Sequence, residues 1–279
     1  MSAVVHAPEP QVVMAQARHE NFPVASLLLP KRVRAHLLAV YGFARLVDDA
    51  GDEAAGDRLA LLDELEADLE RVWGGAPRGP LIARLQPTVA ACGLQIEPFR
   101  RLIEANRRDQ LVHRYDTYED LLGYCELSAN PVGELVLRIF GVATADRLAL
   151  SDKVCTALQL TEHWQDVGED YARGRVYLPL EDLRHFQVSE PELGAPAAGP
   201  EVRSLVEFEV RRARELLDEG APLVRTLSGR PRLAVAAFVA GGRSALEAIE
   251  RAGYEVLGSP PRAGRARRAL EAVRTLIGG

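Results

Sequence analysis

The sequence predicts an all-α protein, because helical patterns fill it and strand patterns are nearly absent. Apolar residues recur at spacings of three and four through most of the chain, in segments rich in Leu, Ala, Arg and Glu, and this spacing places them on one face of a helix. Aromatic residues are only 6% of the chain, and alternating β-branched and aromatic runs, which would indicate strands, are scarce. We therefore expect one domain of many helices over 1–279, with a flexible N-terminus over about 1–15.

The expected helices follow one another from residue 31 to residue 277. Apolar spacing predicts them near 31–50, 57–73, 80–92, 97–110, 117–127, 131–141, 146–170, 201–219, 221–228, 231–254 and 262–277. Glycine and proline cluster at 74–80 (GGAPRGP) and at 188–200 (VSEPELGAPAAGP), which is typical of loops. Because helical patterning of the same kind lies on both sides of 188–200, we interpret that stretch as a surface loop within the domain.

Composition excludes several classes of protein. Apolar residues make up 47% and charged residues 27% of the chain, as in ordinary soluble globular proteins, and a net charge of −6 argues against a nucleic-acid partner. Cys92, Cys125 and Cys155 form no CxxC pair, which argues against a disulfide framework or a zinc site. No apolar run approaches the roughly 18 residues of a membrane span, and we see no signal peptide. We therefore expect a cytoplasmic protein.

One expected helix is unusually apolar and ends in a cluster of acids. Segment 36–47 (HLLAVYGFARLV) is apolar on nearly every face, and such a helix belongs in the protein interior. Asp48 and Asp52 follow it, four residues apart, so they share a face. Tyr41 and Arg45 extend the same face backwards, which makes a line of polar groups along a buried helix.

The same layout recurs in the second half of the chain. Segment 154–164 (VCTALQLTEHW) is mostly apolar and is followed by Asp166 and Asp170, again four residues apart. Gln159 and Glu162 lie seven and four residues before Asp166, on the same face. The sequence therefore predicts two buried helices that each carry a DxxxD step.

Carboxylates gathered in the interior destabilise a protein unless something compensates them. Mg²⁺ would do so, because it prefers oxygen ligands and is usually held by one or two carboxylates together with substrate phosphates. Two opposing acidic helix faces would hold a metal–diphosphate cluster. The alternative is that both acidic ends are solvated, as we expect for the acids at 63–70 on an amphipathic helix. The recurrence on two apolar helices favours the metal.

At these residues the chain resembles the squalene/phytoene synthase family. Segment 41–53 (YGFARLVDDAGDE) is similar to the family's first aspartate-rich motif, and 158–179 (LQLTEHWQDVGEDYARGRVYLP) to its second. Segments 124–141 and 253–262 also fit, and the resemblance covers about 19–275. It implies a single-domain, all-α isoprenoid synthase fold with a central helix-lined cavity.

Within the family, 19–30 (HENFPVASLLLP) and 128–141 (SANPVGELVLRIFG) most resemble the bacterial hopanoid branch, the hydroxysqualene synthases. The resemblance implies conversion of presqualene diphosphate and water to hydroxysqualene and diphosphate. It also implies a Mg²⁺ cofactor, for which Mn²⁺ would substitute, and no NADPH. Other hopanoid-pathway enzymes would make the substrate and consume the product.

The resemblance also implies roles for individual residues. It makes the carboxylates metal ligands, namely Asp48, Asp49, Asp52, Glu162, Asp166 and Asp170. It assigns the catalytic role to Tyr41, Asp48, Asp52, Tyr124, Asn130, Asp166 and Asp170. It assigns binding of the substrate diphosphate to His19, Arg45, Gln159, Arg173 and Arg175. A structural role for Tyr124 and Asn130, and a surface position for His19, stay open.

Two residues depart from the family pattern. Glu162 stands where the family usually has Asn, and Gln165 stands where many members have Arg. Glu162 adds a negative charge and puts the metal affinity in doubt. The missing arginine suggests that contact with the diphosphate is redistributed to Arg45, Arg173 or Arg175.

The C-terminal stretch 262–279 is predicted to be a basic amphipathic helix. In one interpretation it lies on a membrane surface, with Leu270, Val273 and Ile277 packed inward and anionic lipid contacted by Arg262, Arg265, Arg267, Arg268 and Arg274. In the other it is an ordinary terminal helix with a solvated face.

Three rival functions stay open. The first is head-to-head condensation of two prenyl diphosphates by a presqualene diphosphate, squalene or phytoene synthase. The second is a non-catalytic assembly factor of the same fold, which the four retained aspartates disfavour. The third is a di-iron carboxylate bundle, which would need paired ExxH steps that we do not find.

Overall fold

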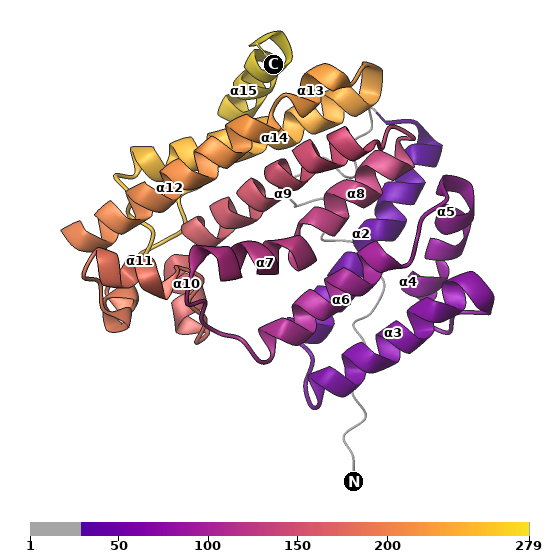
Figure 1. Ribbon diagram of the computed structural model, residues 1–279, viewed down its shortest axis with the longest axis horizontal. Helices are drawn as coiled ribbons and strands as arrows, with labels where there is room; N and C mark the ends of the chain where they lie inside the picture. The colour runs from indigo at the N-terminus through magenta and orange to yellow at the C-terminus, as the bar shows by residue number, and fades with distance from the viewer. Residues whose placement is uncertain (1–28, 279) are drawn as a thin grey trace. The chain divides into compact units, whose positions relative to one another are not determined.

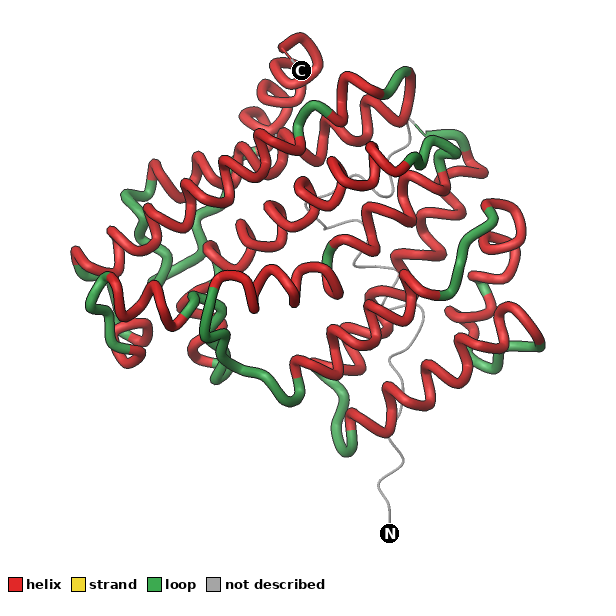
Figure 2. The backbone as a smooth tube through the Cα atoms, viewed as in Figure 1, coloured by secondary structure: helices red, strands yellow, loops and turns green. Residues whose placement is uncertain are grey.

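The computed structural model describes residues 29–278, except for the side chains at 265–267, 269 and 277–278. Every regular element in this range is a helix (Figure 2). Extended backbone pairs there in one isolated bridge, between Arg114 and Val176. The all-α prediction is therefore confirmed for the described part of the chain. The expected flexible N-terminus over 1–15 lies outside it.

The helices run from α2 near the beginning of the described range to α15 at its end (Figure 1). Their bounds are α2 (Lys31–Asp52), α3 (Arg58–Gly74), α4 (Pro80–Ala83), α5 (Leu85–Cys92), α6 (Glu97–Asp109), α7 (Tyr118–Ser128), α8 (Asn130–Ile139), α9 (Ala145–Gln165), α10 (Val167–Ala172), α11 (Leu180–His185), the 3₁₀ helix η1 (Glu190–Gly194), α12 (Pro200–Gly220), α13 (Leu223–Thr226), α14 (Gly229–Arg251) and α15 (Arg265–Gly278).

Four expectations about the helices need correction. The helix expected at 80–92 is two helices, because Pro87 has no N–H and fits only in the first turn of a helix that starts anew at Leu85. The helix expected at 146–170 is interrupted at Asp166. The C-terminal helix begins at Arg265 rather than at residue 262. The short helices α11 and η1 were not expected, and η1 lies in the loop expected at 188–200.

The chain forms two compact units, which we describe separately. The first contains the described residues up to 111 together with 131–144, and the second contains 112–130 and the residues from 145 onwards. The expected single domain over 1–279 and its central helix-lined cavity concern how these units associate. Both stay predictions.

In the first unit, α2 is the central element and packs against α3, α4, α5 and α6. Phe43 and Val47 of α2 are completely buried, and the Phe43 ring contacts the edge of the Phe99 ring of α6 at a centroid distance of 5.2 Å. The expected burial of segment 36–47 is confirmed for most of its apolar side chains, namely Leu37, Ala39, Val40, Phe43, Leu46 and Val47. At the acidic end of α2, Asp49 is buried, whereas Asp48 and Asp52 are exposed.

In the second unit, α9 packs against α7, α12 and α14 (Figure 1). Leu160 and Trp164 near its C-terminal end are completely buried. At Gly220 the end of α12 comes so close to α9 that a Cβ atom would lie 2.9 Å from the Leu150 carbonyl oxygen, so only glycine fits there. The second apolar helix is therefore held inside its unit, as expected.

Candidate active site

The first acidic segment is the C-terminal end of α2. Asp48 and Asp52 are both exposed, and the pKa of Asp48 is raised to about 6, with partial desolvation of its carboxylate as the largest cause. The Asn106 Nδ2 atom donates a hydrogen bond to Asp48 Oδ1 at 3.1 Å, which opposes the rise, as does Arg45. The negative charges of Asp52 and Asp49 add to it. Asp48 is therefore a carboxylate whose charge protein groups compensate only in part.

Asp49 does not share this face. Its side chain is buried, 3% exposed, and forms an ion pair with Arg45 at 2.7 Å between Nε and Oδ1. Glu53 lies 3.5 Å from the same guanidinium, while Tyr41 is half-buried one turn earlier. Arg45 therefore pairs with Asp49, while its positive charge also acts on Asp48.

Asn106 was not among the residues predicted from the sequence. This side chain of α6 is 8% exposed and also donates to the Leu102 carbonyl. A Cβ atom at Gly51 would lie 2.3 Å from Asn106 Oδ1, so glycine at 51 makes room for the amide. The available signal was a polar residue on the apolar face of the expected helix at 97–110, where Phe99, Leu102 and Ile103 also lie.

The second acidic segment lies at the junction of α9 and α10. Asp166 separates the two helices, and its carbonyl accepts a hydrogen bond from the Asp170 N–H at 2.8 Å. Desolvation, followed by the negative charge of Asp166, raises the pKa of Asp170 to about 7, against the opposing effect of Arg175 and Arg173. Burial also raises the pKa of Asp166. Two adjacent carboxylates thus lie here in a partly desolvated position.

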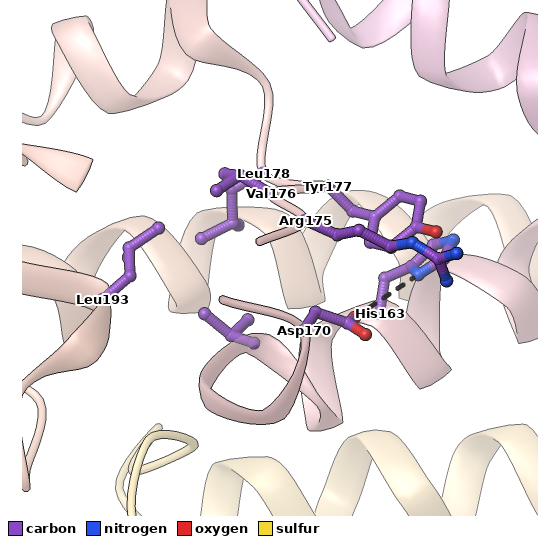
Figure 3. A pocket seen from close by; sticks show the side chains of 8 residues that line it. His163, Asp170, Arg175, Val176, Tyr177, Leu178 and Leu193 are labelled. Atoms are coloured by element: carbon purple, nitrogen blue, oxygen red, sulfur yellow. Dashed lines mark ion pairs between the residues drawn. The ribbon is translucent and has the colours of Figure 1, made fainter. Parts of the chain in front are cut away.

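A small pocket beside Asp170 is lined by polar side chains on one side and by apolar side chains on the other (Figure 3). The His163 ring stacks on the Tyr177 ring with centroids 3.7 Å apart and an interplanar angle of 18°. His163 Nδ1 lies 4.0 Å from Asp170 Oδ2, which is too far for a hydrogen bond. Burial, followed by the positive charge of Arg175, lowers the pKa of His163 to about 3, so the imidazole is neutral. Figure 3 shows Arg175 beside this stack.

Several predicted residues surround this stack. The Tyr124 ring lies 5.8 Å from the Tyr177 ring and 6.1 Å from the His163 ring, and Gln159 Nε2 lies 3.3 Å from His163 Nε2. His163 and Tyr177 were not predicted as site residues, because no pattern in the sequence distinguishes them. Their stacking depends on the path of the chain after α10, which brings Tyr177 back to His163 of α9.

The other predicted residues of the second unit differ in exposure. Asn130 is buried and accepts a hydrogen bond from Thr156 Oγ1 at 2.9 Å, which supports the structural role left open for it. Glu162 is half-buried one turn before Asp166, and Arg173 is exposed. His19 lies outside the described residues.

The donor chemistry of both segments fits a hard cation. Each segment carries two aspartates one helical turn apart, and in each the negative charge of one aspartate raises the pKa of its partner. Within 29–278, however, no three His, Cys, Asp or Glu side chains converge on one point. A metal bound to either segment would therefore complete its shell with water or with substrate oxygens, as Mg²⁺ usually does.

Comparisons with known proteins cover nearly the whole chain. The 15-cis-phytoene synthase of Synechococcus elongatus is 34% identical over 251 residues, which are 85% of this chain and 82% of that protein. The hydroxysqualene synthase of Zymomonas mobilis is 35% identical over 204 residues, 71% of this chain and 67% of that protein.

Solved structures show the same relationship. The squalene synthase HpnC of Alicyclobacillus acidocaldarius is 46% identical with a TM-score of 0.81, over 90% of this chain and 95% of that one. A dehydrosqualene synthase in complex with a ligand is 26% identical with a TM-score of 0.85, over 96% and 95%. The described helices thus form the all-α fold of squalene synthase-like isoprenoid synthases.

The model of the squalene/phytoene synthase family matches residues 15–270. This range includes both acidic segments and the segment that carries Tyr124 and Asn130. The chain therefore belongs to the squalene/phytoene synthase family of enzymes.

Proposed function

We propose that this chain is a hydroxysqualene synthase, which ionises presqualene diphosphate with the help of Mg²⁺ and adds water to give hydroxysqualene and diphosphate. The observation that carries the proposal is the pair of acidic segments, each with an aspartate whose pKa is raised by desolvation. The choice of reaction is supported by the 46% identity to the squalene synthase HpnC and by the hydroxysqualene synthases near 35%.

Asp48 and Asp52 of the first segment, and Asp166 and Asp170 of the second, are the metal ligands in this proposal, with Glu162 in support. Bound Mg²⁺, or Mn²⁺ in its place, would neutralise the charge that develops on the leaving diphosphate. The raised pKa of Asp48 and Asp170 supports this role, because a carboxylate poorly compensated by the protein gains most from a cation.

Basic and polar side chains share the diphosphate in this proposal. Arg175 lies beside Asp170 in the pocket, Arg173 is exposed just before it, and Gln159 lies one turn before His163. In the first unit, Asp49 orients the guanidinium of Arg45. Arginine donors directed at the leaving group stabilise its charge in the transition state.

Ionisation leaves a carbocation that apolar and aromatic side chains must shield from early attack by water. Tyr124 lies among the rings of Tyr115 and Tyr177, and aromatic faces attract cations. We propose that Tyr41 and Tyr124 steer the cation. Asn130 would act indirectly, through the backbone that its hydrogen bond to Thr156 holds.

Head-to-head condensation of two prenyl diphosphates is the second candidate, because phytoene synthases are as similar to this chain as hydroxysqualene synthases are. Product analysis separates the two. With presqualene diphosphate and Mg²⁺ we expect hydroxysqualene without NADPH, and no product in EDTA. Phytoene from geranylgeranyl diphosphate, or squalene formed only with NADPH, would reject the proposed reaction in favour of a sister activity. The enzymes that supply presqualene diphosphate and reduce the product are partners in the sense that they share a substrate or product with this chain.

We further propose that α15 contacts a membrane surface. No helix among the described residues is long and apolar enough to cross a bilayer. The expectation that Leu270 and Val273 pack inward is wrong, since each is 53% exposed. The reason is that α14 presents Arg243 to α15, which turns the polar residues Glu271 and Thr275 inward instead. Ile277 has no described side chain.

The positive charge of α15 indicates that its exposed face, which carries Leu270 and Val273, binds an anionic bilayer. Segment 265–278 contains four arginines and one glutamate, in a chain whose net charge is −6. The Arg274 side chain is 64% exposed, next to Val273. Apolar side chains flanked by arginine are typical of helices that lie in the interface of anionic membranes.

The Leu270→Ser/Val273→Ser double variant tests this contact. We expect wild-type protein to sediment with vesicles that contain about 30% phosphatidylglycerol and the variant to lose most of this binding, because buried apolar area and lipid charge act together. The matched control is Leu111→Ser, which removes a leucine that is 71% exposed elsewhere. Equal sedimentation of the wild type and the double variant would contradict the proposal.

A further inference from the structure

Gln165 occupies the position at which many members of the family carry an arginine, and its side chain is engaged. Its Nε2 atom donates a hydrogen bond to the Pro261 carbonyl, 96 residues further along the chain. Gln165 is the last residue of α9 and immediately precedes Asp166. The amide therefore joins the acidic junction to the segment before α15.

A second attachment lies one turn away. A Cβ atom at Gly168 would stand 2.5 Å from the Leu257 carbonyl oxygen and 3.0 Å from the Leu257 Cα. The backbone at Leu257 is therefore packed directly onto the first turn of α10. Between the two attachments the chain contains Pro260 and Pro261, whose rings restrict the backbone. The stretch 257–261 is thus held against the start of α10 at both ends.

Arg262 follows directly after the second attachment. It is exposed to solvent, so its guanidinium is available to a ligand. It adjoins Pro261, whose carbonyl accepts the hydrogen bond from Gln165, the residue directly before Asp166. The segment thus returns an arginine to the surroundings of Asp166, beside the position where this chain has Gln165.

We propose that Arg262 binds the substrate diphosphate beside Asp166 and that Gln165 is its positioning residue, so that the two together replace the arginine that many relatives carry at position 165. This inference rests on the proposed function, because it needs a diphosphate at the second acidic segment. It also changes the assignment of Arg262, which the sequence placed among the lipid-contacting arginines. An arginine attached in this way contributes charge-assisted hydrogen bonds to phosphate oxygens.

The proposal is tested with four variants: Arg262→Ala, Gln165→Ala, the double variant of both, and Gln165→Arg combined with Arg262→Ala. Binding of inorganic pyrophosphate in the presence of Mg²⁺ is measured by calorimetry, and kcat/KM is measured with the substrate. We expect Arg262→Ala to weaken pyrophosphate binding about 10- to 100-fold, the size of a lost charged hydrogen bond. Arg230→Ala is the matched control, because Arg230 is an exposed arginine at the start of α14.

The combined variants separate positioning from a merely structural role. If Gln165 acts through Arg262, Gln165→Ala weakens binding by about 3- to 10-fold alone and adds nothing to Arg262→Ala. The Gln165→Arg change should then restore at least about tenfold of the loss in Arg262→Ala. The melting temperature of Arg262→Ala should stay unchanged, and that of Gln165→Ala should fall by only about 2–4 °C, the size of one lost hydrogen bond.

Each contrary result has a distinct meaning. Unchanged affinity in Arg262→Ala, in a wild type that binds pyrophosphate, would overturn the role of Arg262 and leave the proposed function standing. Multiplying effects of the two alanine changes would overturn the positioning role of Gln165. A wild type that neither binds pyrophosphate nor turns over any prenyl diphosphate would reject the proposed function, and this inference with it.

Discussion

Asp48→Asn and Asp166→Asn are each expected to reduce kcat/KM by about 100- to 1,000-fold or more while the protein stays folded. Loss of one group that stabilises developing charge in a transition state has effects of this size. Asparagine keeps the shape of the side chain and removes the negative charge. The two variants thus test the acidic segments one at a time.

The physical reason for retained stability is in the pKa values. Desolvation raises the pKa of Asp48, and desolvation together with Asp166 raises that of Asp170. A folded-state pKa above the unfolded value means that ionisation destabilises the native state as pH rises through that range. At pH 8 a neutral residue at 48 or 166 should therefore leave the melting temperature unchanged or raise it, and Mg²⁺ with pyrophosphate should no longer stabilise the variant.

Two aspartates outside the segments provide controls. Asp63 is an exposed partner of Arg107 on α3, and Asp146 is exposed in the first turn of α9. Their replacement by asparagine should leave kcat/KM within about twofold, because surface ion pairs contribute little. Full activity in Asp48→Asn or Asp166→Asn, or full activity of the wild type in EDTA, would contradict the assignment of the acidic segments.

Glu209→Gln is expected to stabilise the protein at neutral and alkaline pH. Glu209 of α12 is completely buried, and desolvation, followed by a hydrogen bond to Asp182, raises its pKa to about 9. Arg212 contacts both carboxyls, at 2.7 Å from Asp182 and 3.3 Å from Glu209, and its guanidinium lies 4.3 Å from the centroid of the Tyr118 ring. One cation thus serves two acids, so Glu209 keeps its proton.

The sign and size of the effect follow from this raised pKa. Below pH 4.5 both the folded and the unfolded state hold the proton, and Glu209 has no influence on the pH dependence. Between pH 4.5 and about 9 only the folded state keeps it, so the free energy of unfolding falls by about 1.4 kcal/mol per pH unit. By neutral pH the loss amounts to several kcal/mol. Glutamine needs no proton and can still donate its amide hydrogen to Asp182.

Urea unfolding at several pH values measures this effect. We expect Glu209→Gln to exceed the wild type by about 2 kcal/mol or more at pH 8 and by less than about 1 kcal/mol at pH 5. Glu215→Gln on the same helix is the control, because Glu215 is exposed and should change nothing at either pH. A difference between Glu209→Gln and wild type that is constant from pH 5 to pH 8 would contradict the account.

The local pattern of the sequence was enough to predict the fold class and the two acidic pairs. Apolar spacing gives helix positions because a helix with such a stripe must bury it. A spacing of four residues places Asp48 beside Asp52 on any helix, and one hydrogen bond at the α9–α10 junction preserves the same relation between Asp166 and Asp170. These relations are local, so they do not depend on how the rest of the chain packs.

Only the tertiary structure decided which partners these residues have. Asn106 reaches Asp48 from α6, Arg212 serves two buried acids from different helices, and Gln165 meets Pro261 from far along the chain. Arg243 of α14 contacts Thr275 and Glu271 of α15, and Leu270 and Val273 on the same helix face outward. The spacing of residues along one helix carries no information about the polar groups on its neighbour. Those groups determine the partners, because a buried polar atom must find a hydrogen-bond or charge partner wherever the packed chain provides one.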